Sequence, residues 1–102
     1  MTAFLPLATR PLMVLSAVLD KARTLGDTPA GNRKVVNVLG GSLEGERIRG
    51  RVLPGGGDWA VTRLDGVLLL DVRLTLETED GALILCRYEG VRHGPAHVMA
   101  RL

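Results

Sequence analysis

Apolar and polar residues alternate along the β-rich segment 67–78, and an Asp-Gly pair stands just beyond each of its ends. Alternation with a period of two is typical of a strand that buries one face. Asp65-Gly66 and Asp80-Gly81 favour tight hairpin turns, because glycine adopts a positive φ angle without steric cost. The pattern therefore predicts a three-stranded antiparallel meander in the central part of the chain.

Other segments carry shorter versions of these signals. Gly, Asp and Pro residues predict a loop over residues 26–31. Pro95 suits the first position of a helix, so we predict a short C-terminal helix over residues 95–102. Its inward side chains would be Val98, Met99 and Leu102. The remaining predicted strands are residues 34–39, 46–53 and 59–64, and residues 11–20 form either a first strand or a short amphipathic segment.

The run Pro54-Gly55-Gly56-Gly57-Asp58 has the glycines of a phosphate-binding loop but not its other parts. Such a loop needs Lys and Ser or Thr after its last glycine, and a following helix whose amides point at the anion. Here Asp58 would repel a phosphate, and Trp59 begins a strand. The run therefore indicates a bulge, or a mobile loop beside the mouth of a pocket.

Two-residue turns at both Asp-Gly pairs would determine which side chains face each other. In that register Arg73 lies opposite Asp58 on one neighbouring strand and opposite Tyr88 on the other. One face of the meander would form the core, with Trp59, Val61, Leu68, Leu70, Val72, Leu74, Leu76, Leu83 and Leu85. The other face would be polar, with Asp58, Thr62, Asp71, Arg73, Thr75, Glu77, Cys86 and Tyr88.

The polar face is the predicted ligand-binding site, with Arg73 at its centre. Asp58 and Tyr88 would lie across the neighbouring strands, and Asp71 and Thr75 two positions away on the same strand. A guanidinium held in this way has a defined orientation. It could bind a ligand carboxylate through paired donors or polarise a carbonyl group.

Two carboxylates on this face are candidate catalytic residues. Asp71 or Glu77 could act as a general base if burial raised its pKa. The alternative is a solvated sheet face whose charges pair across strands, with each exposed pair contributing less than about 1 kcal/mol. The sequence leaves both interpretations open.

Composition narrows the possible classes of protein. The chain of 102 residues is predicted to form one domain, residues 1–102. It has one Trp, one Tyr and one Phe, so the core must consist of Leu and Val. The net charge is +2 without a basic stripe or interleaved aromatic residues, which disfavours nucleic-acid binding. The single Cys86 excludes an intramolecular disulfide and favours a reducing, cytoplasmic compartment.

Membrane, metal and cofactor sites are also disfavoured. No segment reaches transmembrane length. The apolar stretch 1–19 lacks the early positive charge and the small-residue cleavage site of a signal peptide. His93 and His97 are separated by Gly94-Pro95, and no third ligand with metal spacing stands near them. We therefore expect no membrane insertion, no metal and no cofactor.

A series of loops and turns follows in order along the chain: Gly26 to Gly31, Gly40-Gly41, Glu44-Gly45, Pro54 to Trp59, Asp65-Gly66, Asp71 and Asp80 to Ile84. From about Pro11 to the last residue, this series resembles the domain of unknown function 3237 family, also called UPF 0311. The resemblance implies an antiparallel β-barrel, similar to the calycins or to the allene oxide cyclase barrel. It implies no settled biochemical role.

The resemblance also implies further aromatic-rich strands after the short helix, whereas this sequence stops at Leu102. We therefore expect a C-terminally shortened member, made of the N-terminal part of the family domain. Its barrel would be incomplete and would have an unpaired sheet edge. A homo-oligomer would close that edge.

Two kinds of function are compatible with these patterns. The first is a binding module that holds a small, mostly apolar metabolite in the barrel lumen, with Arg73, Asp58 and Tyr88 at its polar end. The second is a cofactor-free isomerase or cyclase, with Asp71 or Glu77 as proton acceptor and Arg73 as electrophile. An inactive, truncated paralogue is a third interpretation.

Overall fold

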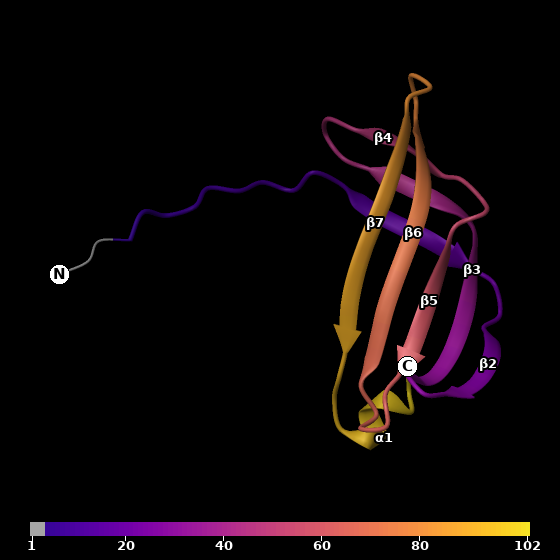
Figure 1. The fold of residues 1–102 in the computed structure, drawn as a ribbon. Coiled ribbons are helices and arrows are strands. Elements are labelled where there is room, and N and C mark those ends of the chain that lie inside the picture. Colours follow the sequence, from indigo (N-terminus) through magenta and orange to yellow (C-terminus); the bar gives the residue numbers. More distant parts are fainter. Residues whose placement is uncertain (1–3) are drawn as a thin grey trace.

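The computed structural model describes residues 4–102, which form one seven-stranded antiparallel sheet and one short helix (Figure 1). The predicted all-β class is confirmed. Residues 1–3, which belong to the predicted domain and to the apolar stretch 1–19, lie outside the described part. The strands are β1 (Val14–Leu19), β2 (Arg23–Thr28), β3 (Gly31–Glu44), β4 (Arg49–Val52), β5 (Gly57–Thr62), β6 (Leu68–Thr78) and β7 (Leu83–Arg92), and the helix is α1 (Ala96–Met99).

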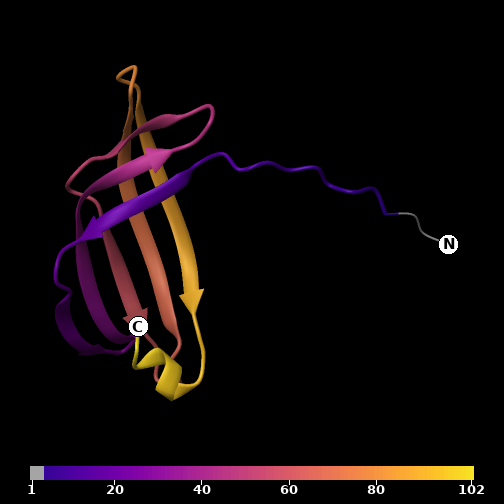
Figure 2. The same cartoon turned by 180° about the vertical axis from the view of Figure 1, so that it is seen from behind.

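Two long strands, β3 and β6, organise the sheet because each changes partners along its length. The first half of β3 pairs with β2 and β5, and its second half pairs with β1 and β4. The first half of β6 pairs with β5 and its end pairs with β4, while β7 follows it throughout. The sheet therefore bends, and β1 and the end of β3 run across the direction of β6 and β7 in both views (Figures 1 and 2).

The described sheet is open. Within residues 4–102, β7 pairs only with β6, and β1 and β2 pair only with β3. These strands present free backbone groups that could pair with further strands. The expected homo-oligomer would use such edges, and it stays a prediction from the sequence.

The core lies where the crossing strands cover the end of β6. Leu43 is 0% exposed, and Leu74 and Leu76 are each 1% exposed. They pack with Val38, Val52 and Val72, which confirms a core of Leu and Val. Close approach of the backbones depends on glycine, since a Cβ atom on Gly50 would lie 2.0 Å from the Glu77 carbonyl oxygen.

The predicted loop over residues 26–31 is wrong in its first half. Strand β2 runs through Gly26 to Thr28, and only Pro29 and Ala30 form the turn before β3. Gly26 has a φ angle of +95° and lies where the β2–β3 register shifts. A glycine in the sequence suggests that a strand ends. At a bulge, however, the strand can continue through the glycine.

The C-terminal helix begins and ends within the predicted range 95–102. It covers Ala96 to Met99, with Pro95 just before it and a turn at residues 100–101. Of the three side chains predicted to face inward, Met99 is half-buried, whereas Val98 and Leu102 are exposed. In the described part of the chain, no helix has the length and apolar character needed to cross a membrane.

The chain before β1 extends away from the sheet. Residues 4–13 form no helix or strand, and Phe4, Leu5 and Leu7 are exposed. Figure 2 shows this arm leaving the body of the molecule at the start of β1. The predicted first strand over residues 11–20 is confirmed only for residues 14–19.

Both central hairpins have loops of three residues, not two. The Arg63 N–H donates to the Val67 carbonyl oxygen at 2.9 Å, and the Thr78 N–H donates to the Ala82 carbonyl oxygen at 2.9 Å. A two-residue type I′ turn needs positive φ angles at both central residues. Gly66 and Gly81 have φ angles of +84° and +87°, but among residues 4–102 no residue other than glycine has a positive φ. The aspartates therefore exclude the type I′ turn.

Each extra loop residue shifts the register by one. Asp58 and Tyr88 both lie opposite Val72, while Arg73 lies opposite Gly57 and Arg87. The predicted pairs of Arg73 with Asp58 and with Tyr88 are wrong. Because side chains alternate between faces, a shift of one residue moves every cross-strand neighbour to the other side of the sheet.

Candidate functional site

The register shift divides the predicted ligand site between the two faces of the sheet. We call the face of β6 that carries Val72, Leu74 and Leu76 the core face, and the opposite one the outer face. Directly paired residues share a face. Asp58 and Tyr88 therefore lie on the core face, because both are opposite Val72.

The other predicted site residues lie on the outer face, where they alternate with the buried leucines of β6: Asp71, Arg73, Thr75 and Glu77. Arg51 donates to the Glu77 carboxylate, with 2.9 Å between Nε and Oε1. The Arg73 guanidinium carbon lies 5.8 Å from the centre of the Trp59 ring. The predicted arrangement of Asp58 and Tyr88 around Arg73 is thus absent. Other charged side chains of the outer face pair across strands, as in the alternative interpretation. Ligand binding by Arg73, Asp71 and Thr75 stays a prediction from the sequence, and it would concern the outer face.

The same shift corrects the predicted core. Trp59 is 43% exposed and Leu85 is 80% exposed, although both were expected to be buried. Leu83 is exposed as well. Val72, Leu74 and Leu76 are buried as predicted. The alternation within β6 therefore predicted its buried residues correctly. The prediction of which side chains of the neighbouring strands share a face with them was wrong.

The Asp58 side chain takes part in the pairing of β5 with β6, at the edge of the core face. Its Oδ1 accepts a hydrogen bond from the Asp71 N–H at 3.0 Å. The β5–β6 ladder is interrupted at this point, between the pairs Asp58–Val72 and Val61–Leu69. The carboxylate thus replaces a backbone carbonyl as the acceptor for a strand amide. This bond holds the Asp58 side chain in place on the core face.

The turn before β5 positions Asp58. The Gly55 N–H donates to the Val38 carbonyl oxygen, and the Val38 N–H donates to the Gly56 carbonyl oxygen. A Cβ atom on Gly56 would lie 2.5 Å from the Arg73 carbonyl oxygen. The glycine run therefore allows a tight crossing between β4 and β5 against the backbone of β6, and a strand, not a helix, follows it.

Tyr88 has a raised pKa. Partial burial of the phenol is the main cause, and the nearby Cys86 and Asp58 side chains add to it. A negative neighbour disfavours the phenolate, as does removal from water. The influence of Asp58 agrees with the register, which places Asp58 and Tyr88 on either side of Val72.

The titration of the single tyrosine tests this arrangement. We expect the pKa of Tyr88 to lie above its ordinary value of 10.0. In Asp58→Asn it should fall part of the way back, because one charge is removed and burial remains. Absorbance of the phenolate in the near ultraviolet measures the pKa. The folded state favours the neutral phenol over the phenolate. The stability that Tyr88 contributes is therefore fully present below its pKa in the unfolded chain, and it is lost as the pH rises through its pKa in the folded protein.

Asp71→Asn is the matched control for that titration. It removes a carboxylate from the outer face of the neighbouring strand and should leave the pKa of Tyr88 unchanged. An equal effect of the two substitutions would contradict the register.

A hollow of about 520 Å³ lies on the core face, between the sheet and the chain that follows β7. In Figures 1 and 2, α1 lies at the end of the sheet where β5 and β7 finish and β6 begins. The polar lining of the hollow consists of Lys34, Asp58, Thr62 and Arg92. The rest of its lining is apolar or glycine: Leu19, Val36, Ala60, Gly66, Leu68, Leu70, Met99, Ala100 and Leu102. The volume of the hollow lies within the range of small-molecule sites.

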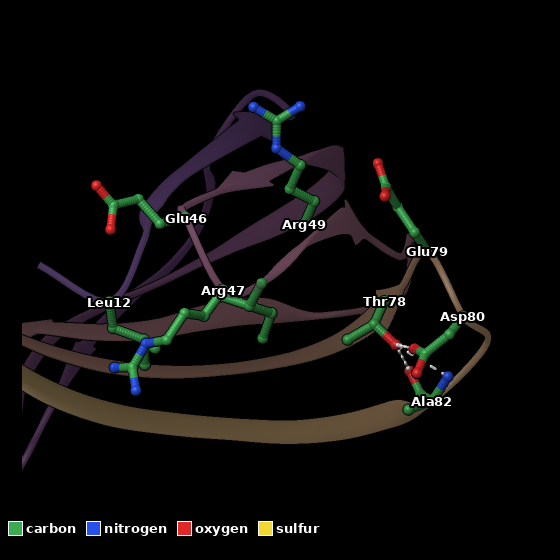
Figure 3. Close-up of a pocket in the computed structure, with 9 residues that line it drawn as sticks. Leu12, Glu46, Arg47, Arg49, Thr78, Glu79, Asp80 and Ala82 are labelled. Carbon is green, nitrogen blue, oxygen red and sulfur yellow. Dashed lines mark hydrogen bonds between the residues drawn. The ribbon is translucent and has the colours of Figure 1, made fainter.

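A second hollow, at the tip of the β6–β7 hairpin, is less suited to a ligand. Figure 3 shows that Arg49 and Glu79 point away from its centre. The Thr78 hydroxyl donates to the Asp80 carboxylate, and the Ala82 N–H donates to the Thr78 hydroxyl oxygen. These groups satisfy one another within the turn. The hydrogen bond from the Thr78 hydroxyl is the main cause of the lowered pKa of Asp80.

A third hollow lies on the outer face beside Trp59 and Asp71. It is smaller, at about 430 Å³, and no part of α1 covers it. The Oδ1 atom of Asp71 is buried there without a hydrogen-bond partner, and Arg87 Nε lies 3.9 Å from it. The core-face hollow is bounded by more elements, so we take it as the candidate site.

Two residues of this site were missed by sequence reasoning. Lys34 lies on β3 and Arg92 at the end of β7, far from the predicted Arg73 cluster in sequence. They share a hollow only because β5 and β6 lie between their strands in the sheet. Alternation with Val36 would have placed Lys34 on an inward face, but no local signal indicates Arg92. For metals, no group of three His, Cys, Asp or Glu side chains within residues 4–102 could hold an ion.

The sequence and fold are similar to those of proteins without an established role. A UPF0311 protein of Rhodopseudomonas palustris is 31% identical over 96 residues, which cover 94% of this chain and 63% of the relative. A UPF0311 protein of Bradyrhizobium diazoefficiens is 30% identical over 96 residues, covering 94% of this chain and 62% of the relative. This chain therefore spans less than two thirds of the length of either one.

Solved structures show the same fold. The crystal structure of a conserved protein of unknown function from Rhodopseudomonas palustris superposes with a TM-score of 0.85 at 30% identity, covering 88% of this chain and 60% of that one. A β-barrel-like protein from Acinetobacter baumannii gives a TM-score of 0.71 at 33% identity, covering 91% and 64%. The similarity to calycins and allene oxide cyclase stays a prediction.

The family model described as "Protein of unknown function (DUF3237)" matches residues 7–102. This match covers the whole sheet and α1, and it confirms the resemblance seen in the loops and turns. The chain belongs to the DUF3237 family, whose curated relatives are the UPF0311 proteins.

Proposed function

We propose that this protein binds a small, mostly apolar metabolite in the hollow on the core face. The observation that carries the proposal is the lining of that hollow, about 520 Å³ in volume, by apolar side chains from β3, β5, β6 and the C-terminal turn. Sites of this size that combine an apolar wall with a few polar groups are typical of small-molecule binding. The same apolar groups would otherwise remain in contact with water.

The polar end of the ligand would lie near Lys34, Asp58, Thr62 and Arg92, not near Arg73. Of the residues first predicted to bind it, Asp58 lines the hollow and Tyr88 lies on the same face. Asp58 is already oriented by the Asp71 N–H. Asp58 is thus held in place before the ligand arrives, which reduces the ordering cost of association.

The enzymatic alternative has less support from the geometry. Asp71 and Glu77, the candidate bases, lie on the outer face, and Glu77 is paired with Arg51. A general base must come within hydrogen-bonding distance of the proton that it removes. Asp58 is the carboxylate that lines the hollow within the described residues, and one of its oxygens is engaged by a backbone amide. We therefore propose binding without turnover.

Filling the hollow tests the proposal. Thr62→Phe places a large ring into the cavity from β5, and we expect it to weaken binding of a neutral apolar dye such as Nile red by about tenfold or more. The physical reason is steric, because the ring takes the volume in which the probe would be buried. Dye fluorescence in a concentration series measures the dissociation constant.

Thr75→Phe is the matched control for this experiment. It makes the same change in size on the exposed outer face of β6 and should leave the dye affinity within about twofold of the wild type. Unchanged affinity in Thr62→Phe, with both variants folded by circular dichroism, would contradict the proposed site.

A further inference from the structure

We infer that the ligand of the core-face hollow is an anion, a small carboxylic acid with an apolar body, and that Lys34 and Arg92 bind its carboxylate. This inference rests on the proposed function and adds the chemical class of the ligand. It is carried by the positions of two cationic side chains in the lining and by the apolar surface between them.

Lys34 and Arg92 enter the hollow from two sides. Lys34 on β3 lies opposite Ala60 of β5, and Arg92 on β7 lies opposite Leu68 of β6. All four residues line the same cavity. In a flat sheet β3 and β7 would lie roughly 14 Å apart, at about 4.8 Å for each strand spacing. Lys and Arg side chains are long enough to span most of that gap, so that one small anion between them can interact with both.

Neither cation is neutralised by the protein. Within residues 4–102 the ion pairs of the structure are formed by Arg51, Arg63 and Arg87. No carboxylate lies within ion-pair distance of Lys34 or Arg92 in this part of the chain.

Asp58 is the opposing charge in the lining, and it does not cancel the two cations. Lys34, Arg92 and Asp58 are the charged groups that line the hollow, which leaves an excess of one positive charge. Asp58 Oδ1 also accepts the Asp71 N–H, which holds part of its charge at the sheet backbone. Excess positive charge in the lining favours an anionic ligand group over a cationic one.

The apolar part of the lining determines the rest of the ligand. Ala60, Leu68 and Leu70 form the floor between the two cations, and Met99 and Leu102 come from the C-terminal segment. A bare inorganic anion would leave these groups without a partner. A compact chain or ring with one carboxylate satisfies both the charge and the apolar surface.

Three probes with nearly the same alkyl chain separate the contributions. Octanoate, octan-1-ol and octylammonium differ in charge at one end, and their affinities can be compared by isothermal titration calorimetry or by NMR line broadening. We expect octanoate to bind about tenfold more tightly than octylammonium, with octan-1-ol between them. Lys34→Gln and Arg92→Gln should each weaken octanoate about fivefold and leave octan-1-ol within about twofold.

Arg33→Gln is the matched control, because it removes one positive charge from the residue next to Lys34 in sequence but on the opposite face of β3. It should leave the binding of all three probes unchanged. If octan-1-ol binds and is excluded by Thr62→Phe, but octanoate binds no more tightly than octylammonium, the charge inference is wrong and the proposed function stands. If none of the probes binds the wild-type protein, or if Thr62→Phe has no effect on any of them, both are wrong.

Discussion

Gly41→Ala is expected to destabilise the protein by about 3 kcal/mol or more. Gly41 has a φ angle of +150°, which strains any residue with a side chain. A Cβ atom there would lie 2.0 Å from the Ser16 carbonyl oxygen and 3.0 Å from the Ala17 Cα. Both are backbone atoms of β1, so relief requires β1 to move away from β3. Because the second half of β3 covers the core, that movement would expose Leu43 and its neighbours.

Gly40→Ala is the control for this prediction, one residue away in the same strand. The nearest atom to its added methyl group would be the Val52 carbonyl oxygen at 3.7 Å, an ordinary contact. We expect the free energy of unfolding to change by less than about 1 kcal/mol. A small increase is favoured, because alanine lowers the conformational entropy of the unfolded chain. Urea unfolding followed by circular dichroism measures both variants. Equal destabilisation by the two substitutions would show that the close approach of β1 at Gly41 is not as described.

Leu74→Ala should cost about 2–5 kcal/mol of folding stability. Its side chain is 1% exposed and belongs to the cluster formed by Val38, Leu43, Val52, Val72 and Leu76. Truncation removes apolar surface from the core and leaves a cavity that β-strands held by ladders on both sides cannot collapse to fill. The free energy of unfolding from urea titration gives the loss.

Leu85→Ala makes the same chemical change at a position that the sequence alone predicted to be in the core. The three-residue hairpin loop places Leu85 on the outer face, where it is 80% exposed. We therefore expect a loss below about 1 kcal/mol. If Leu85→Ala destabilised the protein as much as Leu74→Ala, the two-residue turn and its register would be correct and the division of the site described above would be wrong.

The family and the fold class followed from local signals. Alternation along β6, with glycines at the turns, was enough to indicate antiparallel strands, because side-chain period and glycine φ angles are properties of short segments. A scarcity of aromatic residues indicated a core of Leu and Val, as Leu43, Leu74 and Val52 show. The same local logic failed at Gly26, where a bulge continues β2 through a segment whose composition is typical of a loop.

The candidate site could not be predicted in the same way, because it depends on one residue of hairpin register. An Asp-Gly pair is compatible with a two-residue type I′ turn and with a three-residue loop that ends in a glycine bulge. The choice depends on the φ angle of the aspartate, which the hydrogen bonds of Arg63 and Thr78 determine in this protein. One additional residue in each hairpin loop moved Asp58 and Tyr88 to the core face and left Arg73 on the outer face.

The amino-acid sequence by itself determined the β class, the places of the two central hairpins, the aliphatic character of the core and the family, because these depend on neighbours a few positions apart. Only the tertiary structure decided which charges meet. Lys34 and Arg92 line one hollow because β5 and β6 pair between their strands, and the sheet bends because β3 and β6 each exchange partners midway. Contacts of this kind join residues that are distant along the chain, and a shift of one position in either hairpin changes all of them.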